Sequence, residues 1–94
     1  MSKSFIIIGL GRFGTSTARM LTTLGHEVLV VDKRADRVNG IKDSVMHAVQ
    51  ADATDERALS QLGVRNFDTV VICIGDDIRA SILTTVLCRE MGAK

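Results

Sequence analysis

Three glycines near the start of the chain have the spacing of a phosphate-binding loop. Gly9, Gly11 and Gly14 directly follow an apolar run and precede a stretch of helical periodicity. In such a loop the first glycine allows a tight turn, the second lets the backbone approach a phosphate, and the third lets a helix pack against a strand. The N-terminus of the helix offers free N–H groups and a positive dipole to that phosphate. The loop therefore predicts a nucleotide-binding β–α unit.

An acidic residue stands where this kind of site binds a ribose. Asp32 ends the apolar run of residues 28–31, at the distance from the loop that the motif requires. Its carboxylate would accept hydrogen bonds from ribose hydroxyls and repel a 2′-phosphate, so NADP is disfavoured against NAD, ATP or ADP. Lys33, which we include in the site, and Arg34 could accommodate extra phosphate or simply face water. A glycine turn and an aspartate that only cap a structural βαβ unit are the alternative interpretation.

Two further turns are expected to face the same ligand. In an open α/β sheet the ligand lies at the carboxyl ends of the strands, where the strand order reverses. Asp52 could accept hydrogen bonds from an adenine amino group or a ribose, or it could cap a helix. Gly75 would allow close approach of the backbone. The complete predicted site consists of Gly9, Gly11, Arg12, Phe13, Gly14, Asp32, Lys33, Asp52, Ala53, Thr54, Ile74 and Gly75.

Short apolar runs alternate with helical periodicity along the chain. The expected strands are residues 4–8, 27–31, 46–50 and 69–74. The expected helices are residues 13–24, residues 36–42, a short one between a cap at Thr54 and Gly63, and one from Asp76 or Asp77 to about Met91. This alternation predicts an α/β fold, a Rossmann-type doubly wound parallel sheet of order 3-2-1-4 with helices on both faces. The fourth strand would then be an open apolar edge.

Composition narrows the class of protein. The 94 residues, without proline or repeats, predict one domain over residues 1–94, and the net charge of +1 gives no sign of nucleic-acid binding. The apolar runs are too short to cross a bilayer and no signal-peptide pattern is present, so a cytoplasmic chain is expected. Cys73 and Cys88 lack metal-site spacing and are interpreted as reduced core residues. His26 and His47 are not at predicted carboxyl strand ends, so no catalytic residue is predicted and binding without turnover is favoured.

Three segments carry a family resemblance. The stretches IIIGLGRFGTSTARMLTTLGHEVLVVDKR, HAVQADATDERALSQLGVRNFDTVVICIG and ASILTTVLCREMGAK resemble the nucleotide-binding half of the regulator of potassium conductance family, also called the KTN domain. The chain is most similar to cytosolic subunits of bacterial potassium-uptake channels, in which a GxGRFG loop, an acid ending strand two, an A/G-D-A-T stretch and an I-G turn recur. The resemblance implies a non-enzymatic gating subunit at the cytoplasmic face of the membrane.

The resemblance also implies a ligand and partners. The adenine-nucleotide state, ATP against ADP or NADH against NAD, would be transmitted through a ring of such domains to a membrane potassium channel or transporter. Arg12 could reach a terminal phosphate and bind it bidentately, or lie over the first helix paired with an acid. Two other functions stay open: the N-terminal cofactor-binding fragment of an NAD-dependent dehydrogenase, and a structural subunit that binds nothing.

Two expectations concern the end of the chain. Domains of the resembled family continue into two more parallel strands and a small carboxy-terminal lobe, so the 94 residues are expected to be a truncated form or to have the open edge covered by another chain. The fourth helix has apolar residues over more than half of its circumference. This surplus predicts a homodimer or larger assembly with contacts at Leu83, Val86 and Leu87.

Overall fold

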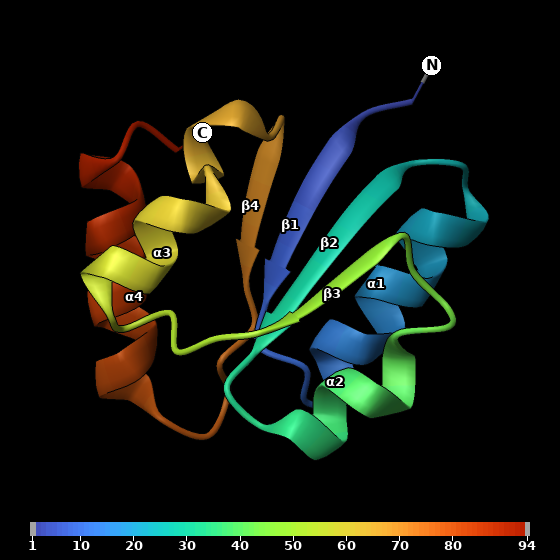
Figure 1. Cartoon of the computed structure of the whole chain (residues 1–94), viewed down its shortest axis with the longest axis horizontal. Coiled ribbons are helices and arrows are strands. Elements are labelled where there is room, and N and C mark those ends of the chain that lie inside the picture. The colour runs from blue at the N-terminus through green and yellow to red at the C-terminus, as the bar shows by residue number, and fades with distance from the viewer. Residues whose placement is uncertain (1, 94) are drawn as a thin grey trace.

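Four parallel strands form the centre of the molecule (Figure 1). The computed structural model describes residues 2–93. The strands are β1 (Ser4–Ile8), β2 (Glu27–Asp32), β3 (His47–Gln50) and β4 (Thr69–Ile72), and their order in the sheet is β3-β2-β1-β4. This is the predicted order. Because the chain runs from β1 to β2 and β3 on one side and returns to β4 on the other, the strand order reverses beside the carboxyl end of β1.

Helices cover both faces of the sheet, as Figure 1 shows. The helices α1 (Arg12–Thr23) and α2 (Ala35–Ile41) lie on one face, and α3 (Glu56–Leu62), the short 3₁₀ helix η1 (Val64–Asn66) and α4 (Ile78–Glu90) lie on the other. Successive residues of β1 point to opposite faces, which divides the core in two. Ile7 packs with the α1 and α2 residues, whereas Ile6 and Ile8 pack with those of α3 and α4.

Most predicted elements form, but one predicted helix cap is wrong. The side chain of Asp55 accepts hydrogen bonds from the N–H groups of Arg57 and Ala58, so Asp55 caps α3 and the predicted cap at Thr54 is wrong. Asp77, one of the two residues predicted to cap α4, is its cap and accepts a hydrogen bond from the N–H of Ala80. Some strand ends also move: β3 starts one residue later than predicted, and β4 ends at Ile72 rather than at residue 74. Beyond the end of β4, the N–H of Cys73 still bonds to the carbonyl of Ile8, and the backbone of residues 73–74 lies against Gly9.

The outward face of α4 is apolar, but one predicted contact residue is not on it. Leu83 is 45% exposed and Val86 is 46% exposed, with Ile78 and Ile82 also exposed. Leu87, however, is only 9% exposed and packs in the core with Cys88. Leu87 lies three residues from Thr84, and these two residues and Cys88 form the buried side of α4. Leu83 lies at the border of that side and is half exposed. Leu87 is therefore a core residue and not a contact residue.

The two cysteines are free thiols, Cys88 buried and Cys73 half-buried. Burial raises the pKa of both thiols, which keeps them protonated and unreactive near neutral pH. None of the helices in the described part of the chain has the length and apolar character needed to cross a bilayer.

The positions of the two α4 leucines predict different stability effects. Leu87→Ala should lower the free energy of unfolding by about 2–5 kcal/mol, because it leaves a cavity in the core. Leu83→Ala should change it by less than about 1 kcal/mol, because the side chain already faces solvent. Urea unfolding of both variants, followed by circular dichroism, measures the difference. Similar losses in the two variants would contradict the assigned orientation of α4.

Candidate functional site

A cavity of about 380 Å³ opens at the carboxyl ends of the strands. The segments that follow all four strands line it, and so does the start of α4. Every residue of the predicted site lines this cavity except Gly14. The lining residues that the sequence did not indicate include Arg37, Asp77 and Ala80. The fold thus gathers four turns, separated along the chain, around one hollow.

The glycine loop forms one wall of the cavity. Gly9 has a φ of +104°, a conformation that side chains rarely adopt, and a Cβ atom there would lie 2.6 Å from the carbonyl oxygen of Cys73. Gly11 precedes α1 in extended conformation, and a Cβ there would meet nothing within 4 Å. No side chain caps the first turn of α1, and this turn contains no acidic residue. Its N–H groups and the open space over Gly11 are therefore available to an anion.

Gly14 lies behind the loop, on the helix side, and has a packing role. A Cβ at Gly14 would collide with the carbonyl oxygen of Gly9 and press on the side chain of Cys73. Only glycine allows α1 to approach the strands this closely. Gly14 therefore shapes the loop without lining the cavity.

Asp32 joins two walls of the cavity. Its side chain is buried, and Oδ2 accepts a hydrogen bond from the N–H of Leu10 at 2.7 Å. Oδ1 accepts a second bond from the N–H of Arg34 at 2.8 Å. The guanidinium of Arg37 lies 3.6 Å from Oδ2. The carboxylate predicted to bind a ribose thus also holds the glycine loop against the turn that follows β2.

Asp52 and Thr54 form a compact turn on the far side of the cavity. Oδ1 of Asp52 accepts hydrogen bonds from the Thr54 hydroxyl at 2.6 Å and the Thr54 N–H at 2.9 Å. These bonds, helped by the charge of Lys33, lower the pKa of Asp52 below its ordinary value, so the group is ionised near neutral pH. The hydroxyl of buried Thr84 on α4 donates to the carbonyl of Ala53. Asp52 does not cap α3, whose cap is Asp55. Its Oδ1 closes the turn at Thr54, and its Oδ2 takes part in neither of these bonds.

The four cations that line the cavity differ in their partners. Arg34 forms an ion pair with Asp36 at 3.1 Å, and Arg37 pairs with Asp32. Lys33 lies near enough to Asp52 to affect its titration. Within residues 2–93, no carboxylate lies within 4.0 Å of the guanidinium of Arg12. The end of the cavity at β2 and β3 is therefore balanced in charge, and the end at the glycine loop carries an exposed, uncompensated cation.

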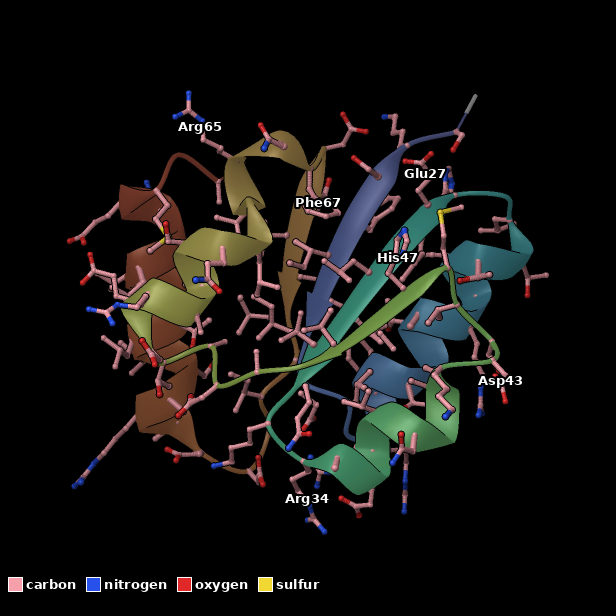
Figure 2. The ribbon with its side chains drawn as sticks, viewed as in Figure 1. Glu27, Arg34, Asp43, His47, Arg65 and Phe67 are labelled. Atoms are coloured by element: carbon pink, nitrogen blue, oxygen red, sulfur yellow. The ribbon has the colours of Figure 1, made fainter. Side chains whose placement is uncertain are left out.

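The remaining polar candidates are placed elsewhere. His47 begins β3, and His26 accepts a hydrogen bond from the N–H of Lys3 and lies edge-on to Phe5. In Figure 2, His47 lies towards the amino end of its strand, whereas Arg34 lies beyond the carboxyl ends. Neither histidine lines the cavity. Residues 2–93 also contain no cluster of three histidine, cysteine or acidic side chains able to bind a metal ion.

The family is decided by a match over nearly the whole chain. The family model of the TrkA-N domain matches residues 5–94. The chain belongs to the TrkA-N domain family. It is 49% identical over 92 residues to the Ktr system potassium uptake protein C of Bacillus subtilis, and 41% identical over 92 residues to the Ktr system potassium uptake protein A of Vibrio alginolyticus. Each alignment covers 98% of this chain and 42% of the relative, so the chain spans about two-fifths of the length of these proteins.

Solved structures of other proteins share the fold of this chain. The NAD(P)-binding domain of an exopolyphosphatase-related protein from Archaeoglobus fulgidus has a TM-score of 0.83 and 30% identity, over 95% of this chain and 66% of that one. A Shewanella denitrificans Kef CTD in AMP-bound form has a TM-score of 0.75 and 25% identity, over 93% of this chain and 52% of that one. Together with the sheet order, these likenesses confirm the predicted Rossmann-type fold.

Two helical glycines give a test of the loop geometry. Gly14→Ala should lower the free energy of unfolding by about 1–3 kcal/mol, because the new methyl group overpacks the contact with Gly9. Gly40→Ala should raise it by about 0.5–1 kcal/mol, because Gly40 lies in α2 with open space around it and alanine favours the helix. Chemical denaturation of both variants gives the two signs. A neutral or stabilising Gly14→Ala would refute the close approach of α1.

Proposed function

We propose that the chain is the adenine-nucleotide-binding domain of a regulatory subunit that gates a potassium-uptake channel or transporter. The observation that carries the proposal is the gathering of the glycine loop, Asp32, the turn at residues 52–54 and the turn at residues 74–75 around one cavity. Membership of the TrkA-N family and the names of the Ktr relatives support the link to potassium uptake. The domain binds without catalysing a reaction of its own.

The cavity suggests an orientation for the nucleotide. The phosphates lie over Gly11 and the uncapped start of α1, and the ribose lies at Asp32. The base lies between the turn that contains Ala53 and the turn that contains Ile74, with Oδ2 of Asp52 as an acceptor for the adenine amino group. Gly75 lets the backbone approach this end. A cavity of about 380 Å³ suits a mononucleotide or one half of a dinucleotide.

Charge indicates which nucleotides fit. Lys33, Arg34 and Arg37 each have an acidic neighbour, so the ribose end holds no spare cation for a 2′-phosphate. A ligand with a free 2′-hydroxyl, such as ATP, ADP, NAD or NADH, is favoured over NADP. Arg12 is exposed at the opposite end, without a carboxylate partner among the described residues, and its planar guanidinium matches a terminal phosphate. Arg12 thereby senses how many phosphates the ligand carries.

The proposed partners follow from the relatives. The domain forms the nucleotide-binding part of a longer subunit, with further strands and a carboxy-terminal lobe, since the Ktr relatives are more than twice its length. That subunit assembles on a membrane potassium channel or transporter at the cytoplasmic face. It binds no nucleic acid and does not insert into the membrane itself. Several copies of the subunit would form a ring, and a change of bound nucleotide in the ring would alter the channel.

Binding is tested by thermal shift and calorimetry on the 94-residue chain. ATP, ADP, NAD or NADH at one hundred times its dissociation constant should stabilise the fold by about 2.7 kcal/mol. NADP should give a smaller shift at the same concentration. The absence of any shift with all four favoured ligands at millimolar concentration would remove the proposal. The link to gating is tested by co-purification of the full-length subunit with the membrane partner.

Arg12→Ala gives a selective prediction. ATP affinity should fall by roughly tenfold or more, because the terminal phosphate loses a charge-assisted hydrogen-bond pair. ADP affinity should fall less, since a diphosphate does not extend to the guanidinium. Arg19→Ala is the matched control, because Arg19 is exposed on α1 and does not line the cavity. Equal losses for ATP and ADP would assign Arg12 a general role in binding and not a sensing role.

The exposed face of α4 predicts self-association. We expect a homodimer or larger assembly in solution, because an apolar face beside the edge strand β4 is stabilised by removal from water. Leu83→Glu should shift the chain towards monomer in sedimentation equilibrium. Leu24→Glu, the same change at an exposed leucine that follows α1 on the opposite side of the sheet, should leave the assembly intact. A wild-type chain that stays monomeric at high micromolar concentration would contradict the expectation.

A further inference from the structure

Arg37 is the charged side chain closest to the buried carboxylate of Asp32. Its Nη1 atom lies 3.6 Å from Oδ2, and the Arg37 side chain is only 31% exposed. The residue also lines the cavity. Among residues 2–93, Asp32 is the only carboxylate within 4.0 Å of this guanidinium. Arg37 is therefore directed at the point where Asp32 meets the cavity.

The position of Arg37 is fixed by its own helix. Asp32 holds the start of α2 through the N–H of Arg34, and Arg37 lies one turn further along the helix. The next residue, Val38, and Ile41 are buried in the core and anchor α2 on the sheet. The guanidinium is thus supported by a packed helix and by a carboxylate that is itself held by two backbone N–H groups.

The pair of Asp32 and Arg37 complements a hydroxyl group. A hydroxyl donates one hydrogen bond and accepts others, whereas a carboxylate can only accept and a guanidinium can only donate. Asp32 keeps acceptor capacity beyond its two backbone bonds, since its two oxygens offer about four lone-pair sites. Arg37 has five N–H donors, of which the contact with Asp32 occupies one nitrogen. A hydroxyl between the two groups would be satisfied in both of its roles.

We propose that Arg37 is a specificity-determining residue of this cavity, whose guanidinium donates to the ribose 2′-oxygen while Asp32 accepts from the same hydroxyl. The inference rests on the proposed function and adds a residue and a chemical selectivity to it. Its ligand class is the ribonucleotides with a free 2′-hydroxyl. Deoxyribonucleotides lose both bonds, and a 2′-phosphate meets the carboxylate of Asp32.

The charges around Arg37 favour a hydroxyl over a phosphate as its partner. Three cations line this end of the cavity, but Arg34 is engaged by Asp36 and Lys33 lies near Asp52. Arg37 itself faces a buried carboxylate that a dianionic phosphate would have to approach. A neutral hydroxyl is therefore the better partner for the Asp32 and Arg37 pair than an anion.

The test compares ADP with 2′-deoxy-ADP by calorimetry. The wild-type chain should bind ADP roughly tenfold more tightly, the change expected for hydrogen bonds to charged groups. In Arg37→Gln this ratio should fall at least threefold, because ADP loses affinity and 2′-deoxy-ADP loses little. Arg37→Lys, which keeps a charge and a donor, should restore part of the ratio. Arg19→Gln removes a charge from the exposed face of α1 and should leave the ratio unchanged.

Each outcome decides one point. Equal losses for the two ligands in Arg37→Gln would make Arg37 a structural residue and overturn the inference while leaving the proposed function intact. Tighter wild-type binding of adenosine 2′,5′-bisphosphate than of ADP would also overturn it, by assigning this end to phosphate. Failure of the wild-type chain to bind any adenine nucleotide would remove the proposed function and the inference with it. Arg37→Gln could lower the melting temperature enough to prevent titration. In that case the ratio of ADP to 2′-deoxy-ADP affinity in Arg37→Lys decides alone. This ratio should still be lower than in the wild-type chain, because lysine lacks the planar guanidinium and its several donors.

Discussion

The cavity depends on one buried carboxylate. Asp32 accepts from the N–H of Leu10 in the glycine loop and from the N–H of Arg34 at the start of α2, and it faces the guanidinium of Arg37. A buried carboxylate without such partners is strongly destabilising, so the loops after β1 and β2 are held in this arrangement whether or not a ligand is bound. Because the walls are ordered in advance, a ligand need not pay for ordering them on binding.

Much of this arrangement could be predicted from local sequence. The glycine spacing, the apolar strands and the acid that ends β2 are local patterns whose physical reasons lie within a few residues. They predicted the sheet order, and all but one of the site residues chosen from them line the cavity. The structure adds why the glycines are needed: Gly9 carries a positive φ, and Gly14 lies against the Gly9 carbonyl. These contacts cross between elements, but the motif already encodes them.

Other features depend on how helices sit on the sheet, which no local pattern gives. Thr54 and Asp55 are both residue types that cap helices well. The hydroxyl of Thr54 bonds to Asp52, and Asp55 accepts the hydrogen bonds at the start of α3 instead. The apolar α4 has no clear single face in sequence, so the burial of Leu87 could not be separated from the exposure of Leu83. Arg37 was not indicated because its approach to Asp32 requires the direction of α2, which the packing of Val38 and Ile41 sets.

The helix α4 connects the cavity to the outer surface. Asp77 and Ala80 at its start line the cavity, and further along the same helix Leu83 and Val86 face solvent. The hydroxyl of Thr84 also donates to the carbonyl of Ala53, whose turn lines the same cavity. A ligand that moved this turn or the start of α4 would move the exposed apolar face as well, because a helix transmits displacement along its axis as a rigid element. This geometry suits the proposed regulatory role, because residues that line the cavity and residues of the exposed apolar face lie on the same helix. Leu87 and Cys88 pack this helix against the sheet.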